Sequence, residues 1–169
     1  QLTQGAVYHD EGDRMIRDRA YTVIHRAKLQ ALLQVLEEAN GSPILCPIYF
    51  SFEYTEIASV LGYAPPLIAG GTTEREKQSI LDKWDRGEIP LLTVQPASVS
   101  HGLNMQTGGH IIVWYGRPCS LEQYNQLNGR LIRPGQKHPV RVIFISAVDT
   151  ADDRVAKVLA TKGATQESF

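Results

Sequence analysis

Two arginines in the second half of the chain, Arg130 and Arg133, have the type and spacing to bind an anion. They are three positions apart, so on a helix they share one face. Guanidinium groups are always charged and present forked donors, which suits an anionic target such as a triphosphate. Pairing with carboxylates, or solvation on the surface, is the alternative interpretation for an arginine pair on a helix.

Positive charge is concentrated around these arginines. The whole chain has a net charge of −1, yet its stretch Ser98–Val148 contains one acid, Glu122, and five basic residues, namely Arg117, Arg130, Arg133, Lys137 and Arg141. A one-sided basic surface favours contacts with the phosphates of DNA or of a nucleotide. A chance excess on a solvated face is the alternative.

Strand-like and helical stretches alternate along the chain from Lys28 onward. Short apolar runs predict strands at Ile44–Phe50, Leu67–Ile68, Leu91–Val94, His110–Tyr115 and Val140–Ser146. Helical spacing and capping signals predict helices at Leu29–Leu36, Phe52–Leu61, Thr73–Arg86, Ser120–Arg133 and from Thr150 onward. This alternation predicts an α/β fold with a mostly parallel sheet flanked by helices on both faces.

The helix that carries both arginines is expected to begin at Ser120 and to stop at Pro134-Gly135. A capping box of Thr73 and Glu76 opens the predicted helix before it along the chain. Open parallel sheets bind ligands at the carboxyl ends of their strands. The long loop Gln95–Gly109 is expected at that edge.

Residues 1–27 break the alternation. Ala6–Tyr8 and Tyr21–Ile24 indicate either a hairpin around the polar turn Asp10–Arg19 or a linker from a preceding domain. We therefore divide the chain into an extension from a preceding lobe, residues 1–27, and one domain, residues 28–169. A hydrophobic content of 43% suits one such domain with its own core.

Membrane, secreted and zinc proteins are poor matches for this composition. No apolar run approaches the roughly 20 residues that span a bilayer, and no secretory leader pattern opens the sequence. Cys46 and Cys119 stand alone and far apart, which favours a reduced interior over a disulfide framework or a zinc site. The expected location is the cytoplasm of a bacterial or phage-infected cell.

The segment Gln126–Gln136 resembles motif VI of the Swi/Snf branch of superfamily-two helicases. That motif has a Gln, an Arg four residues later, a second Arg three residues after that, and a closing Gly-Gln. Ser100–Met105 is similar to motif V, Ile44–Phe50 to motif IV and Gly70–Arg75 to motif IVa. The resemblance covers about Leu29 to Lys162 and is closest to the compact phage and prophage members. Two departures are Ser98-Val99-Ser100 in place of Ala-Gly-Gly, and Cys119 in place of Trp.

The resemblance implies the second RecA-like lobe of a DNA-dependent ATPase, in which arginines stabilise charge on the γ-phosphate of ATP. It implies catalytic roles for Arg130 and Arg133, with Arg133 the first choice as the arginine finger. It places at the nucleotide Gln126, Gly102 and Asn104, and at the nucleic acid Ser100, His101, Arg75, Lys137 and Arg141. For His101 the alternative is a loop-stabilising role. For Lys137 and Arg141 the alternatives are contacts between lobes or plain solvation.

The sequence lacks the other half of such an ATP site. No Gly-Lys dipeptide of a P-loop occurs, and the stretch before Asp10-Glu11 is too short and polar for a buried Walker B strand. We therefore expect ATP and Mg²⁺ to be held by an N-terminal lobe of the same polypeptide, with duplex DNA as a largely sequence-independent partner. This chain alone is expected to be an inactive fragment.

Two competing hypotheses concern other classes of protein. The first is a non-catalytic nucleic-acid-binding module that keeps the fold but has lost its ATPase partner. The second, a small-molecule nucleotide enzyme with a doubly wound sheet, is disfavoured because the sequence lacks a glycine-rich first turn and a ribose-binding acid at the usual spacing.

Overall fold

The computed structural model of the chain describes residues 2–9, 20–99, 102–118, 120–147, 150 and 152. Its elements are, in order, η1 (Leu2–Gln4), β1 (Ala6–Tyr8), β2 (Tyr21–Val23), α1 (Ala27–Glu38), β3 (Ile44–Pro47), α2 (Ser51–Leu61), β4 (Leu67–Ile68), α3 (Glu74–Asp85), β5 (Leu91–Val94), η3 (Pro96–Ser98), β6 (Ile111–Trp114), α4 (Leu121–Asn128) and β7 (Arg141–Phe144). Within the described ranges, no helix is long and apolar enough to cross a bilayer.

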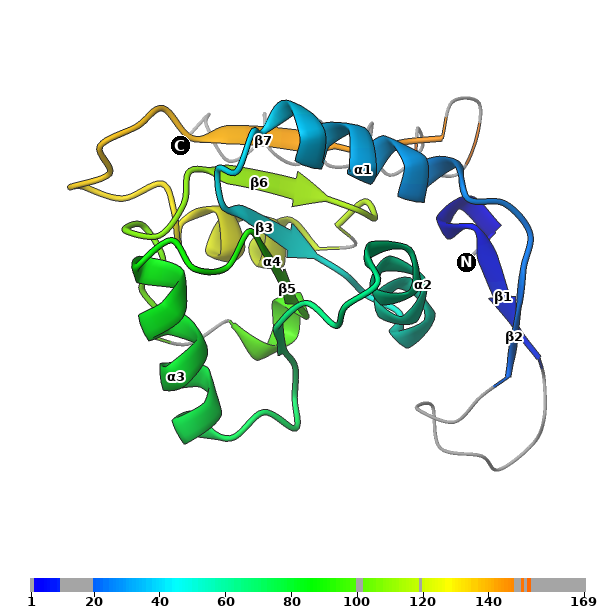
Figure 1. Ribbon diagram of the computed structural model, residues 1–169, viewed down its shortest axis with the longest axis horizontal. Coiled ribbons are helices and arrows are strands. Elements are labelled where there is room, and N and C mark those ends of the chain that lie inside the picture. Colours follow the sequence, from blue (N-terminus) through cyan, green and yellow to red (C-terminus); the bar gives the residue numbers. More distant parts are fainter. Residues whose placement is uncertain are drawn as a thin grey trace.

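Five strands form one sheet in the order β4-β5-β3-β6-β7, and every neighbouring pair is parallel (Figure 1). The central strand β3 pairs Ile44 with Leu91 on one side and with Ile111 on the other. All residues of β3, β5 and β6 are buried. Strands covered on both faces read as continuous apolar runs, which is why these segments were recognisable. The predicted α/β fold with a parallel sheet is confirmed.

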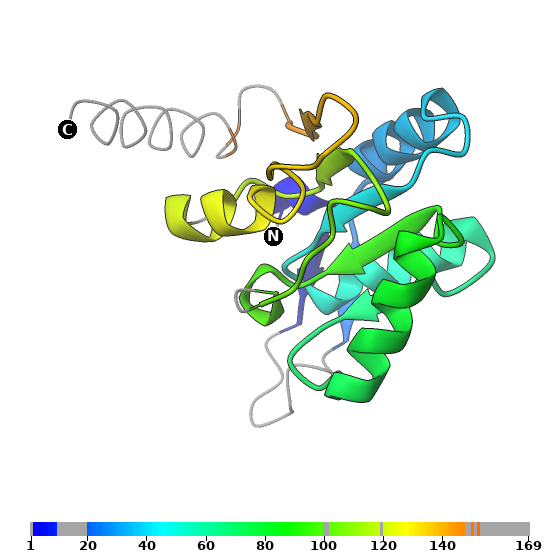
Figure 2. The ribbon, with the colours of Figure 1, turned by 90° about the vertical axis from the view of Figure 1, so that its left-hand side faces the viewer.

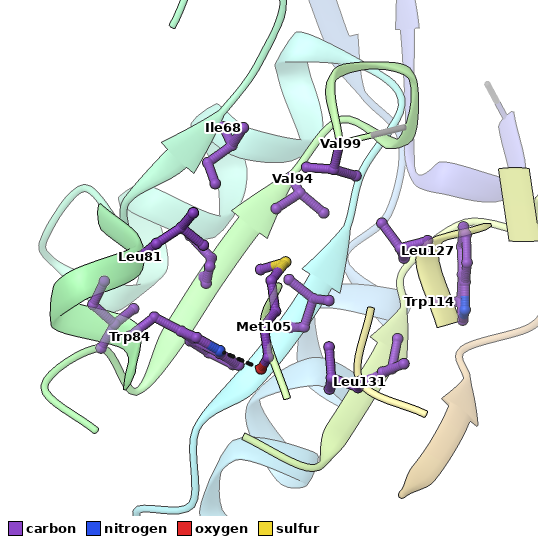
Figure 3. Close-up of a cluster of buried hydrophobic side chains, with 13 residues drawn as sticks. Ile68, Leu81, Trp84, Val94, Val99, Met105, Trp114, Leu127 and Leu131 are labelled. Carbon is purple, nitrogen blue, oxygen red and sulfur yellow. Dashed lines mark hydrogen bonds between the residues drawn. The ribbon is translucent and has the colours of Figure 1, made fainter. Parts of the chain in front are cut away.

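Alternate residues of the strands pack into two separate hydrophobic cores. On one face, Leu45 and Ile112 pack with residues of α3 and α4 and of the loops beside them (Figure 3). On the opposite face, Ile44 and Ile111 pack with residues of α1 and α2. Figure 2 shows α1 and α4 on opposite sides of the strands. Helices therefore cover both faces, as the sequence predicted.

The two predicted caps differ in how closely the structure follows them. Thr73 and Glu76 form the full capping box at the start of α3. Ser120 caps α4, because its side chain accepts a hydrogen bond from the backbone N–H of Gln123. The predicted end of α4 is wrong: the helix stops at Asn128, five residues before Arg133. Gly129, a poor helix former, follows directly and begins a series of tight turns.

The N-terminal strands β1 and β2 pair antiparallel, with Ala6 opposite Val23. The hairpin alternative for this region is thereby confirmed. The hairpin packs beside α2: the Tyr8 hydroxyl lies 2.6 Å from Ser51 Oγ, and the Tyr21 hydroxyl donates to Glu56 at 3.1 Å (Figure 1). The domain boundary at residue 27 stays a prediction.

Candidate functional site

The two arginines lie in the turns after α4, which we call the arginine turn (Gly129–Gln136). Since α4 has already ended, they do not share a helical face, and that expectation is wrong. Arg130 is 8% exposed, and its Nη1 donates to the carbonyl of Leu103 at 3.3 Å. Arg133 is exposed, and its Nε donates to the carbonyl of Gly129 at 2.7 Å. One guanidinium is thus directed into the protein and the other lies on its surface.

The electrostatics of the arginine turn suit an anion. Burial lowers the pKa of the Arg130 guanidinium, and the nearby charge of Arg133 lowers that pKa further. The Arg130 guanidinium remains cationic at neutral pH because a guanidinium begins from a very high pKa. Among the described residues, ion pairs are made by Arg26, Lys28, Lys77 and Arg86. Arg133 forms no ion pair with a described carboxylate. The guanidinium groups of Arg130 and Arg133 therefore lie close together. No described carboxylate balances the charge of the exposed one, Arg133.

The structure brings the arginine turn against the segment Leu103–Gly109, which we call the motif V loop. The N–H of Met105 donates to the carbonyl of Arg130 at 3.3 Å. Just before the loop, Gly102 has φ +73°, a left-handed conformation that favours glycine. Asn104 is exposed within it. The two segments that the sequence placed at a nucleotide are therefore in direct contact.

Gln126 lies on α4, one turn before Arg130. Its side-chain amide donates to the Glu122 carboxylate at 2.9 Å, an i, i+4 contact on the same helix. The residue is half-buried, and its amide lies beside the Glu122 carboxylate on the same side of α4.

The arginine turn ends near the amino ends of the strands. The His138 ring packs against His110, which directly precedes β6, with ring centroids 4.9 Å apart and the ring planes tilted by 35°. The N–H of Arg141 donates to the His110 carbonyl at 2.8 Å. Burial lowers the pKa of the His110 imidazole, and the charges of His138 and Arg141 lower it further. The arginine turn therefore lies away from the carboxyl ends of the strands, because α4 carries the chain back along one face of the sheet. Where the ligand contacts gather stays a prediction.

The crevice between the carboxyl ends of β3 and β6 is occupied by the protein itself. After β3 the chain continues to β4 on one side of the sheet, and after β6 it continues to β7 on the other side. Open parallel sheets usually bind ligands at the point where the strand order reverses in this way. The amide of Gln4, oriented to satisfy its partners, donates to Glu53 Oε1 at 3.1 Å and to the Tyr115 carbonyl at 3.3 Å. A Cβ on Gly116 would come within 2.9 Å of the same amide. This packing argues against a small-molecule enzyme that uses the crevice.

A hollow of about 620 Å³ opens at the carboxyl ends of β3, β4 and β5, between α2 and α3. Its polar lining consists of hydroxyl groups, Gln95 and the Glu76 carboxylate. Such a lining offers no cation to a phosphate. A second hollow of about 450 Å³ lies beside the arginine turn and is lined by Ile132, Arg133, Pro134, Gln136, His138 and Val140.

The predicted nucleic-acid contacts fall into separate groups. Arg75 is exposed in the first turn of α3, which follows the carboxyl end of β4. Lys137 and Arg141 are exposed at the opposite edge, beside the amino ends of β6 and β7. Ser100 and His101 lie outside the described residues. Among the described residues, no three His, Cys, Asp or Glu side chains gather to hold a metal ion.

Residues 27–135 match the family of helicase conserved C-terminal domains. The chain belongs to this family. The match includes α1 to α4 and most of the arginine turn, and it ends one residue before Gln136. The residues that carry the site are therefore those of a helicase C-terminal domain.

Two curated proteins are similar to this chain in sequence. Protein p41 of the Acyrthosiphon pisum secondary endosymbiont phage 1 is 34% identical over 172 residues, which cover 99% of this chain and 35% of that protein. YwqA of Bacillus subtilis (strain 168), described as a candidate ATP-dependent helicase/translocase, is 23% identical over 143 residues, 80% of this chain and 15% of YwqA. The chain thus spans about a third or less of these relatives.

The crystal structure of the C-terminal part of the Fun30 ATPase domain superposes with a TM-score of 0.69 over 78% of this chain and 44% of that one, at 18% identity. A likeness at this identity shows the fold alone. It agrees with the RecA-like lobe that the sequence predicted.

Sequence reasoning missed the residues that hold the site together. Gln136 was recognised only as the last position of a motif, yet its side chain binds the motif V loop. Trp84 is fully buried in the core, and its indole N–H also donates to the Met105 carbonyl at 2.9 Å. A long amide directly after the left-handed Gly135 was the one available signal.

Proposed function

We propose that this chain is the second RecA-like lobe of a Swi/Snf-type, DNA-dependent ATPase and translocase. An N-terminal lobe of the same polypeptide would hold ATP and Mg²⁺, and the protein would act in the cytoplasm of a bacterial or phage-infected cell. The observation that carries the proposal is the exposed Arg133 guanidinium, presented by the arginine turn of a helicase C-terminal domain.

Arg133 is the group best placed to contact a nucleotide bound to another lobe. Its side chain reaches the surface, and its charge is uncompensated by any described carboxylate. In phosphoryl transfer, an arginine that stabilises charge on the γ-phosphate contributes about 10³–10⁵ in rate. Arg130 lies behind it, and its hydrogen bond to the Leu103 carbonyl suits a role in coupling the turn to the motif V loop. Gln126, Gly102 and Asn104 complete the nucleotide side of the proposal.

The described residues that the sequence placed at the nucleic acid lie at two different edges of the sheet. We assign Arg75 to the backbone of duplex DNA, together with Ser100 and His101 of the segment that is similar to motif V. Lys137 and Arg141 lie at the amino edge, near the arginine turn and the hollow beside it. The exposed Ile132 in that hollow, 55% accessible, suits a protein surface better than a phosphate backbone. Contact with the preceding lobe is therefore the role that we propose for Lys137 and Arg141.

The test is ATP hydrolysis by the full-length parent protein, with and without duplex DNA. Arg133→Ala is expected to lower the DNA-stimulated rate by about 10³-fold or more. Arg26→Ala is the matched control, because Arg26 is also exposed but pairs with Glu56 of α2, which packs on the face of the sheet opposite the arginine turn. Its rate should stay within about twofold of the wild type.

If Arg133→Ala hydrolyses ATP at the wild-type rate, Arg133 is not an arginine finger and that part of the proposal fails. A parent protein that binds duplex DNA but shows no ATP turnover would instead support the non-catalytic binding module. Appreciable turnover by the isolated chain would contradict the assignment of ATP and Mg²⁺ to another lobe.

A further inference from the structure

The side chain of Gln136 joins the arginine turn to the motif V loop. Its Nε2 donates to the carbonyls of Gln106 at 2.9 Å, Gly109 at 3.1 Å and Leu131 at 3.4 Å. Its Oε1 accepts a hydrogen bond from the N–H of His138 at 3.1 Å. Both ends of the amide are therefore used, and the partners belong to both sides of the contact.

The motif V loop is anchored from its other side by α3. The indole N–H of Trp84 donates to the Met105 carbonyl, the contact drawn as a dashed line in Figure 3. A Cβ on Gly109 would come within 2.6 Å of Trp84 Cζ2, so the glycine backbone packs directly against the ring. The motif V loop, held in place by Trp84, thus forms the surface against which the arginine turn packs.

The later residues of the arginine turn depend on this surface, because the backbone bonds that the turn makes to α4 come from its first part: the N–H groups of Leu131 and Ile132 donate to the Asn128 carbonyl. Helix α4 ends at Asn128, and the described contact of the Arg133 side chain is to the backbone of its own turn, at Gly129. The first end of the turn is continuous with α4. The second end is held by Gln136, which lies three residues beyond Arg133. The direction of the Arg133 guanidinium therefore follows from where Gln136 holds the chain.

We propose that Gln136 is a positioning residue that fixes Arg133 for phosphate contact by clamping the arginine turn onto the motif V loop. The inference rests on the proposed function of Arg133. Gln136 itself lies beneath the turn and contacts backbone atoms, so its effect passes through the arginine. A shift of about 1 Å in such a group is enough to lower a rate by about 10²-fold.

The experiment compares the full-length parent protein with Gln136→Met, Arg133→Ala and the double variant in DNA-stimulated ATP hydrolysis. Met keeps the length of the side chain and removes both the donor and the acceptor. Gln136→Met should lower kcat by about 10–100-fold, while KM for ATP changes by less than about threefold, since the lost contact acts in the transition state. The double variant should have the same kcat as Arg133→Ala, because positioning has no effect once the finger is gone.

A second variant, Gln136→Asn, retains the amide but is one methylene too short to reach both sides. It is expected to lower kcat in the same direction with less effect on folding, and melting temperatures of all variants are measured alongside. If Arg133→Ala is impaired but Gln136→Asn and Gln136→Met keep kcat within about twofold, or the double variant multiplies the two losses, the positioning role is overturned. If Arg133→Ala itself matches the wild type, the proposed function fails instead.

Discussion

Lys28 and Asp152 form a buried ion pair that ties α1 to the end of the described chain. Lys28 Nζ lies 2.6 Å from the Asp152 carboxylate, and the two side chains are only 3% and 5% exposed. The same ammonium donates to the Tyr115 carbonyl at 3.3 Å. Burial by itself raises the pKa of the Asp152 carboxyl, but hydrogen bonds from Lys28 and from the Ala147 N–H outweigh it, so this pKa lies below its ordinary value. The Asp152 carboxyl is therefore ionised at neutral pH.

Replacing Lys28 with Met should lower the free energy of unfolding of the chain by about 3–5 kcal/mol, because it leaves a carboxylate buried without its cation. Met keeps most of the aliphatic stem, so little packing is lost. Each kcal/mol shifts the melting temperature of a domain of this size by about 2–4 °C, which predicts a fall of roughly 6–20 °C. Urea unfolding followed by tryptophan fluorescence measures the change, since Trp84 and Trp114 are fully buried.

Two further variants separate the charge effect from a general loss of packing. Lys28→Met combined with Asp152→Leu removes both charges and should recover most of the lost stability. Lys77→Met removes a cation from an exposed i, i+3 pair with Glu74 and should cost about 0.5 kcal/mol or less. The reasoning is refuted if Lys28→Met costs no more than Lys77→Met, or if the double variant is as unstable as the single one.

Two other predictions concern stability. Desolvation by burial raises the pKa of the Glu53 carboxyl from 4.5 to about 7, so the folded chain holds this proton more tightly than the unfolded chain. The stabilisation that this group contributes should be fully present below about pH 4.5 and fall by about 3 kcal/mol as the pH rises through 7. Glu53→Gln should flatten this part of the urea-midpoint profile, and an unchanged profile would contradict the shift. Gly109→Ala should cost about 1–3 kcal/mol in urea unfolding, because the new Cβ meets Trp84 and the Pro43 carbonyl. Gly70→Ala, whose nearest neighbour is Ser98 Oγ at 3.9 Å, should be nearly neutral, and equal losses would show that the contact with Trp84 is not the cause.

The sheet could be predicted because its signals are local. Strands buried on both faces leave continuous apolar runs, and Ile44–Pro47 and Ile111–Trp114 are such runs. The capping box of Thr73 and Glu76 is likewise complete within four residues. The end of α4 was harder, because the pattern of Arg130 and Arg133 continues with helical spacing beyond the glycine at which the helix stops.

The long-range contacts that hold the fold and the candidate site together could not be predicted, because they join residues far apart in the sequence. Lys28 and Asp152 are each ordinary charged residues until α1 and the chain after β7 bring them together in the interior. Gln136 looks like a solvent-exposed turn residue, and only the fold shows that carbonyls of the motif V loop surround its amide. Residue type indicated the chemistry of the site, but not which residues hold it in place.

The arrangement of the lobe supports the proposal that Arg133 contacts a ligand bound to another lobe. The crevice at β3 and β6, where a sheet of this kind usually holds a ligand, is filled by Gln4 above the Glu53 carboxyl and the Tyr115 carbonyl. The exposed cation lies instead at the far end of α4, on a turn clamped to the core through Gln136 and Trp84. Because the turn presents Arg133 outward, this guanidinium is not directed at a ligand inside its own sheet. It suits a phosphate that a neighbouring lobe brings to it, and ATP hydrolysis would then depend on how closely the two lobes approach.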